Sequence, residues 1–233
     1  MAVGQTSLVS NQSATDANSY TTASFSSTAG RPILVVVESS KETVSTTPTV
    51  TAHGLTWTQV ATAETDGGTI RRRLTIFEAY PTSNGSGTMV IDFGGVTQYN
   101  CLWDIIEFTG ADTTDMTVQS ATLAGNGFGT VTVTLGAFSD AGNATFGTFG
   151  MNNTTSTLTA GGGFTEISNH ADTTIDAPAR LLTEFVASND TSVDCDISGT
   201  TARRWVGIAV EIKAAVAAVD VEDPFGMRGF FGA

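Results

Sequence analysis

The sequence predicts an all-β protein: a single β-sandwich built from two similar halves and followed by an extended C-terminal arm. The composition favours strands, because the chain is rich in threonine and contains 13 Phe and 25 Gly, residues typical of pleated strands and turns. The length of 233 residues suits one core, since sandwiches often reach about 200–250 residues as one unit. An internal repeat is the third observation, and it predicts that both halves share one architecture.

The repeat consists of short motifs that recur in the same order. Residues 27–37 match residues 139–149, and in both an Ala-Gly turn leads into an apolar strand. Further matches, at separations that drift from 112 to 104 residues, are Trp57 with Phe164, Arg73 with Arg180 and Glu107 with Glu211. Because each half contains only strands, its apolar face must be covered by the other half. We therefore expect both halves to contribute strands to both sheets, related by a pseudo-twofold axis.

Strand signals follow one another in the first half with short turns between them. Residues 19–25 alternate polar and aromatic side chains, and residues 33–37 are continuously apolar, which is typical of a strand buried on both faces. Residues 39–48 are rich in Ser and Thr and predict a solvated loop. The remaining predicted strands are 57–63 and 70–80, joined at Asp66-Gly67-Gly68, and then 89–93 and 101–108.

The second half repeats this scheme. Its predicted strands are 131–138, 145–151, 181–187, 193–197 and 205–213. The predicted domain is therefore a sandwich over residues 1–213, with the duplication at about 19–108 and 131–212, and an arm over residues 214–233.

The arm has no counterpart at the end of the first half. It holds three of the 13 Phe within seven residues, separated by glycines. Each buried Phe would contribute roughly 1.5–3 kcal/mol, so such a cluster favours docking over a solvated tail. Two interpretations stay open: the arm folds back onto its own sandwich, or it docks on a neighbouring chain. We expect a neighbouring chain, with contacts through Phe225, Met227, Arg228, Phe230 and Phe231.

Charge and cysteine content limit the partners. The formal net charge of −13 repels phosphates and anionic lipids, so we expect no binding to nucleic acid or membrane. No segment approaches 18 consecutive apolar residues, and the first residues lack the basic start and apolar run of a signal peptide, so we expect synthesis in a cytoplasm. Cys101 and Cys195 are then predicted to be free thiols rather than a disulfide.

Catalytic and cofactor-binding motifs are scarce. No Gly-x-Ser-x-Gly elbow and no Gly-x-x-x-x-Gly-Lys loop occurs, and neither His53 nor His170 has a partner at metal-ligand spacing. A sandwich glycosidase would need two carboxylates across a cleft, but Glu107 and Glu211 are repeat-equivalent, which indicates a requirement of the fold. We therefore predict no enzymatic activity and no cofactor, and strand glutamates that do not converge: Glu78, Glu107, Glu184 and Glu211.

Two further clusters of charge have alternative interpretations. Aspartate-rich turns at 112–115, 172–176 and 194–196 could offer oxygen ligands to Ca²⁺, but none follows the twelve-residue calcium loop, and turn chemistry and solubility explain them better. A basic cluster, Arg71, Arg72 and Arg73, stands out in an acidic chain. Alternation sends Arg72 to the opposite face from its neighbours. The cluster either pairs with acidic strands nearby or forms a second candidate surface for an acidic partner.

Three motifs carry a resemblance to a known group of proteins. Residues 54–60 (GLTWTQV), 74–80 (LTIFEAY) and 205–212 (WVGIAVEI) resemble jelly-roll-like β-sandwich proteins found among bacteriophage virion proteins and in actinobacterial surface and carbohydrate-active proteins. The resemblance covers about residues 15–213 and includes no catalytic signature. It implies a capsid decoration (cement) subunit or another head or tail accessory subunit, or else an appended carbohydrate-binding module.

The missing signal peptide and missing catalytic domain favour the virion. We expect a homo-oligomeric structural protein, made in the host cytoplasm, whose partners are the major capsid protein or neighbouring copies. The alternative, a carbohydrate-binding module, needs an exposed aromatic platform, for which the candidates are Trp57, Tyr80, Tyr99 and Trp103. We predict instead that Trp57, Trp103 and Trp205 are largely buried.

Overall fold

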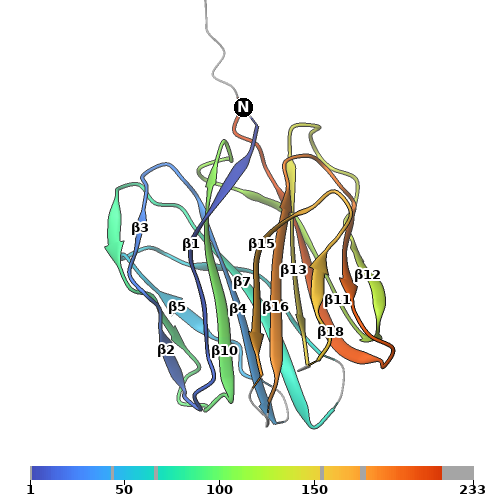
Figure 1. Ribbon diagram of the computed structural model, residues 1–233. Helices are drawn as coiled ribbons and strands as arrows, with labels where there is room; N and C mark the ends of the chain where they lie inside the picture. Colours follow the sequence, from blue (N-terminus) through green and yellow to red (C-terminus); the bar gives the residue numbers. More distant parts are fainter. Residues whose placement is uncertain (1, 43–44, 66–67, 153–154, 174–176, 217–233) are drawn as a thin grey trace, which may run out of the picture.

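The computed structural model describes residues 2–42, 45–65, 68–152, 155–173 and 177–216. Within these ranges every regular element is a β-strand, which confirms the predicted all-β class (Figure 1). The first half contains β1 (Gly4–Ser13), β2 (Ser19–Thr21), β3 (Phe25–Ser27), β4 (Ile33–Glu42), β5 (Thr49–Thr51), β6 (Thr58–Glu64), β7 (Ile70–Ala79), β8 (Gly85–Gly87), β9 (Val90–Asp92) and β10 (Asn100–Thr109). The second half contains β11 (Thr117–Gly127), β12 (Gly129–Thr134), β13 (Ala144–Met151), β14 (Leu158–Ala160), β15 (Thr165–Asp172), β16 (Ala179–Val186), β17 (Ser192–Ile197) and β18 (Arg203–Ile212).

The two halves have the same sheet topology, as the repeat predicted. The first half forms a five-stranded sheet in the order β1-β10-β4-β7-β6 and a three-stranded sheet β2-β9-β5. The second half forms a five-stranded sheet β11-β18-β13-β16-β15 and a three-stranded sheet β12-β17-β14. A two-stranded sheet, β3-β8, belongs to the first half.

Strand register shows which residues are equivalent. Ile33 on β4 pairs with Glu107 and with Ala79, while Thr145 on β13 pairs with Glu211 and with Val186. The resulting separations of 112, 104 and 107 residues are those of the sequence motifs. Equivalent positions can therefore be compared directly between the halves.

The sheets stack in four layers around three cores. One core lies inside each half, between its large and small sheets, and a third lies between the two large sheets. Figure 1 shows the halves side by side, blue to green and yellow to red. We expected both halves to contribute strands to both sheets, and this is wrong, because each sheet draws its strands from one half.

The physical reason is that the central strands are apolar on both faces. On β4, Ile33 and Val35 enter the core of the first half, while Leu34 and Val36 enter the core between the halves. Each five-stranded sheet is therefore covered on both sides, and each half can enclose a small core of its own. The two large sheets then pack against each other with β1 next to β15 and β6 next to β11, an arrangement with pseudo-twofold symmetry.

The core between the halves has an apolar end and a polar end. At the apolar end, Phe108 packs edge-on against Phe146 and Phe185, with ring centroids 6.3 and 5.9 Å apart. At the other end the facing side chains are charged, and Glu38, Arg72, Asp104 and Asp172 are all buried. The arm over residues 214–233 lies outside the described residues from residue 217 onward.

Candidate functional site

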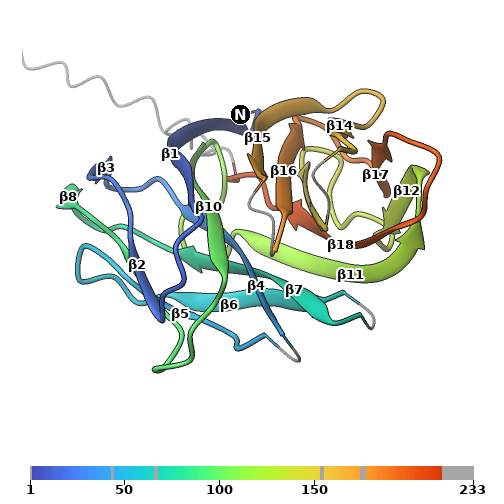
Figure 2. The same cartoon turned by 60° about the horizontal axis from the view of Figure 1, so that its bottom comes forward.

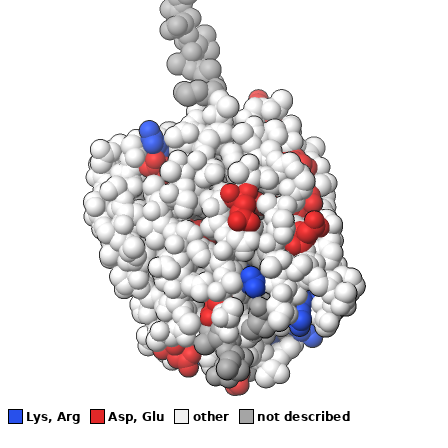
Figure 3. Space-filling model, in the orientation of Figure 1, with Lys and Arg blue, Asp and Glu red and all other residues white. Residues whose placement is uncertain are grey.

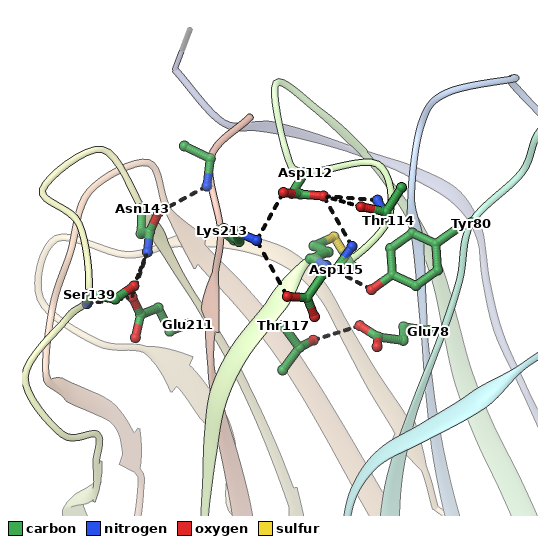
Figure 4. A network of polar contacts seen from close by, with 12 residues as sticks. Glu78, Tyr80, Asp112, Thr114, Asp115, Thr117, Ser139, Asn143, Glu211 and Lys213 are labelled. Carbon is green, nitrogen blue, oxygen red and sulfur yellow. Dashed lines mark hydrogen bonds and ion pairs between the residues drawn. The ribbon is translucent and has the colours of Figure 1, made fainter. Parts of the chain in front are cut away.

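The repeat-equivalent glutamates hold loops in place. Glu211 lies at the end of β18 and is fully buried. Its carboxylate accepts hydrogen bonds from Ser139 N and Oγ at 3.0 Å and from Asn143 Nδ2 at 2.6 Å (Figure 4). It also accepts one from Gln119 Nε2 at 2.6 Å. Burial alone would raise the pKa of Glu211, but these hydrogen bonds lower it below its ordinary value. An ionised carboxylate that organises a loop is a structural group.

Glu107 performs the same task in the first half. Its carboxylate accepts hydrogen bonds from Thr28 N at 3.0 Å and from Arg31 Nη1 at 2.9 Å. Arg31 and Asn143 are equivalent in the repeat and bind equivalent glutamates. The sequence pattern Ser-x-Ala-Gly-Arg/Asn, with a Glu on the last strand, is therefore a loop clamp used twice.

Next to the Glu211 clamp, a polar junction joins the halves where the described chain ends (Figure 4). Lys213 Nζ lies 3.0 Å from Asp112 Oδ2 and 3.4 Å from Asp115 Oδ2. Asp112 also accepts hydrogen bonds from Thr114 N and Asp115 N, and these lower its pKa to about 2. The aspartates of this turn serve the turn itself and Lys213.

Contacts from the first half complete the junction. Met116 N donates to Tyr80 Oη at 2.7 Å, and Thr117 Oγ1 donates to Glu78 at 2.7 Å. A depression of about 370 Å³ beside Lys213 is lined by Ser139, Asp140 and the last described residues. The junction thus anchors the segment from which the arm leaves.

A serine, a histidine and an aspartate meet between the halves. His170 Nε2 lies 2.5 Å from Ser10 Oγ and 3.0 Å from Asp104 Oδ1. A catalytic triad needs the serine and the carboxylate on different ring nitrogens, so that one orients the ring and the other gives up its proton. Here both face the same nitrogen, and Asp104 also accepts hydrogen bonds from Ser168 and Thr183. The cluster joins β1, β10, β15 and β16 rather than activating a nucleophile.

A second buried cluster lies at the same polar end of the interface. Glu38 is fully buried, and neither carboxylate oxygen has a hydrogen-bond partner among the described residues. Burial raises the pKa of Glu38 well above its ordinary value, against the opposing effect of Arg72. Asn100 Nδ2 donates to Asp172 Oδ2 at 2.7 Å and to Ala177 O at 2.6 Å, which ties β10 to the second half.

Glu184 is the fourth strand glutamate and lies inside the second half. Burial raises its pKa to about 8, with smaller contributions from Asp194 and Glu166, while Gly161 N donates to it at 3.0 Å. A Cβ at Gly147 would lie 2.7 Å from Glu184 Oε1, so Gly147 provides the space for this side chain. Glu78, Glu107, Glu184 and Glu211 thus each have different hydrogen-bond partners.

The histidines, cysteines and aspartates of the described ranges do not assemble a metal site. No group of three or more His, Cys, Asp or Glu in these ranges could hold an ion. His53 lies against Phe25, with ring centroids 4.3 Å apart, and its Nδ1 is 2.9 Å from Ser27 Oγ. Cys101 and Cys195 are free thiols, as predicted. Both are buried, and burial raises the pKa of each.

The arginine cluster is mostly committed within the molecule. Arg71 and Arg73 each lie 3.6 Å from Glu64 Oε2, in line with the interpretation that they pair with a nearby acidic strand. Arg72 is 1% exposed and donates to Ile70 O and Pro178 O. The expectation that Arg72 offers a surface to a partner is therefore wrong, because its strand position faces the interface between the halves. Burial lowers its pKa to about 10.

The candidate aromatic platform does not form. Trp103 and Trp205 are buried, as predicted, and Trp57 is half-buried against the core of the first half. Tyr80 and Tyr99 are half-buried, and Tyr80 belongs to the junction described above. The flat face of exposed aromatic rings that a glycan-binding module would use is not found at these positions.

The contact residues predicted for the arm lie outside the described residues: Phe225, Met227, Arg228, Phe230 and Phe231. On the face drawn in Figure 3, basic side chains of the described residues are scattered single groups among more numerous acidic ones. Within the described ranges there is no helix of the length and apolarity needed to cross a membrane.

The buried polar clusters between the halves carry no recognisable sequence motif. One signal for them was present: Asp104 shares its strand face with the apolar residues Leu102, Ile106 and Phe108, so it had to be buried among them. Comparison of the chain with family models, curated proteins and solved structures gives no match.

Proposed function

We propose that this chain is a structural subunit of a bacteriophage particle, a capsid decoration (cement) protein or a head or tail accessory subunit, that acts through protein–protein contacts without catalysis. The observation that carries the proposal is that the groups with catalytic chemistry are committed internally. Glu107 and Glu211 clamp loops, and His170 is held between Ser10 and Asp104. Such a chain can act by presenting a rigid surface.

The segment from which the arm begins is held to the sandwich by hydrogen bonds, which supports this role. Ala215 N donates to Gly110 O at 2.8 Å, and Ala214 N donates to Asn143 Oδ1 at 3.0 Å, in the loop that Glu211 clamps. The aromatic cluster from Phe225 onward is therefore tethered to a fixed point of the sandwich. Its partners in this proposal are neighbouring copies or the major capsid protein. The net charge of −13 disfavours nucleic acid and anionic membranes as partners.

Mass spectrometry of purified phage particles tests the virion assignment directly. We expect peptides of this chain at a fixed ratio to the major capsid protein. Recovery of the chain only in the soluble fraction of lysed cells, free of particles, would contradict the assignment.

A truncation tests the role of the arm. Deleting residues 222–233 should leave the thermal midpoint of the monomer almost unchanged, because the described core ends before it, and should weaken assembly measured by sedimentation velocity. A truncated protein that loses several degrees of stability and still assembles normally would show that the arm straps its own sandwich.

A further inference from the structure

Exposed apolar side chains concentrate on one edge strand. Among the described residues the large apolar side chains with the greatest exposure are Val118 at 39%, Leu123 at 47%, Phe128 at 51% and Val216 at 83%. The first three belong to β11 or to the turn that follows it. Figure 2 shows β11 at the edge of the second half, on the side toward β6 and β7 of the first half, and β11 contacts both β6 and β12.

The first half provides an internal control for this strand. β1 occupies the same edge of its sheet as β11, so the two strands should meet the same structural requirements. Leu123 pairs with Gly207 and Asn11 pairs with Trp103, which makes Leu123 and Asn11 equivalent. The exposed residues of β1 are Thr6, Ser7 and Asn11, all polar. Apolar exposure on β11 is therefore not a requirement of the sandwich.

The outer side of β11 forms no ladder with another described strand. β11 is the last strand of its sheet, and within the described residues no strand pairs with its outer side. Its eleven residues include neither a charged residue nor a proline, the devices that commonly protect an exposed edge. Such an edge accepts an added strand, with backbone hydrogen bonds for affinity and side-chain contacts for specificity.

The end of the described chain indicates what covers this edge. β18 pairs with β11, and the segment beyond it continues past the start of β11, held by Gly110 and Ala111. Val216 then projects from the body at 83% exposure. The 17 residues from 217 to 233 can span up to ~56 Å, which is far enough to reach β11 of another molecule.

We propose that the outer edge of β11, with Leu123 and Phe128, binds the C-terminal segment of a second copy of this chain. This rests on the proposed function, in which the arm makes contacts between subunits. The segment offers Val219 and Val221 before Pro224 and the phenylalanines after it, so a short added strand followed by an aromatic anchor fits an uncharged apolar edge.

Two complementary variants of the full chain test the proposal. Leu123→Asn/Phe128→Asn removes the apolar receptor and keeps the arm, while deletion of 222–233 removes the arm and keeps the receptor. Asparagine at 123 is the residue that the first half carries at the equivalent position, so the fold should tolerate it. Each variant alone should dissociate at least tenfold more readily than the unaltered chain in sedimentation equilibrium, and mixing them should restore a one-to-one complex.

Controls separate the possible failures. Asn11→Ala on β1 should leave assembly unchanged, and circular dichroism melting should show all variants folded. If the β11 variant assembles like the unaltered chain while the truncation does not, the arm docks elsewhere and only this inference falls. If the truncation assembles normally, the role of the arm in the proposed function falls as well. If the unaltered chain is a monomer and the truncation lowers its thermal midpoint, the arm binds its own chain, which overturns the proposal.

Discussion

The two halves of this protein have the same sheet order but differ in the side chains that they carry at equivalent positions. Positions that the sandwich needs are repeated, as with the clamps Glu107 and Glu211. Positions at the polar end of the interface are not repeated. Three charged residues of the first half have uncharged equivalents in the second half. The pairs are Glu38 and Gly150, Arg72 and Ala179, and Asp104 and Ile208.

This difference shows how two copies of one unit became a fixed pair. A symmetric interface would place like charges opposite each other across the pseudo-twofold axis, which is unfavourable in a buried site. At one of these positions the first half carries the charge and the second half leaves space for it: a Cβ at Gly150 would lie 3.0 Å from Glu38 Cδ. At the interface this divergence lets the two halves fit each other, and β11 and β1 also differ at an equivalent position, Leu123 and Asn11.

The largest expected effect comes from the cores inside the halves. Trp103→Ala should lower the free energy of unfolding by about 3–5 kcal/mol, because a buried indole leaves a large cavity. The second half has Gly207 at the equivalent position, where an added Cβ would lie 2.8 Å from Phe149 and Val133 side-chain atoms. Gly207→Ala should therefore also destabilise, by roughly 1–3 kcal/mol through overpacking. Urea denaturation measures both.

Trp57 provides the control for this prediction. It is half-buried, so Trp57→Ala should cost less than Trp103→Ala. An equal cost at the two sites would contradict the division of the first half into an enclosed core and a partly open rim.

The loop clamps should rank next. Glu211→Ala removes the acceptor for Gln119, Ser139 and Asn143. It should destabilise by about 3 kcal/mol, since the buried Asn143 amide loses this partner and the loop loses three further hydrogen bonds. Glu107→Ala should cost only about 1.5 kcal/mol, because the Arg31 side chain is 46% exposed and water can replace the lost acceptor. Equal costs in thermal denaturation would show that the clamps are equivalent in energy as well as in position.

These comparisons also show what the sequence could predict. The repeat, the all-β class and most central strands followed from apolar patterns such as residues 33–37 and 205–212. β1 and β11 were not predicted, because edge strands rich in Ser, Thr and Gln lack an apolar pattern. β4 continues to Glu42 where a loop was expected, since its last residues form the polar end of the interface. The prediction that each sheet combines strands of both halves was wrong, because apolar periodicity does not show which element covers a given face of a strand.

Glu184 should make the stability of the second half depend on pH. The equivalent residue in the first half is Phe77, which does not titrate. Burial raises the pKa of Glu184 from about 4.5 to about 8, so the folded state holds the proton more tightly than the unfolded state. Its contribution to stability is therefore complete below pH ~4.5 and is lost as the pH rises toward 8, with a slope approaching ~1.4 kcal/mol per pH unit.

Glu184→Gln removes this titration and keeps the acceptor for Gly161 N. The stability advantage of the variant over the unaltered chain should grow by about 2 kcal/mol between pH 5 and pH 7. Urea denaturation of both proteins across this range measures it, and other titrating groups cancel in the difference. An advantage that stays constant with pH would show that Glu184 is ionised throughout.

The smallest expected effect is a coupling between the equivalent positions that face each other, Glu38 and Gly150. Gly150→Ala alone should destabilise by about 1 kcal/mol, because the added methyl would lie 3.1 and 3.3 Å from the Glu38 carboxylate oxygens, inside a site where Glu38 is fully buried. In a Glu38→Ala background the crowding is gone, and the same substitution should be neutral or stabilising, since alanine loses less conformational entropy than glycine in a strand. The double-mutant cycle should give a coupling of about 1 kcal/mol. A coupling near zero would mean that the two halves do not meet at these residues, and the explanation of the charge asymmetry would fail with it.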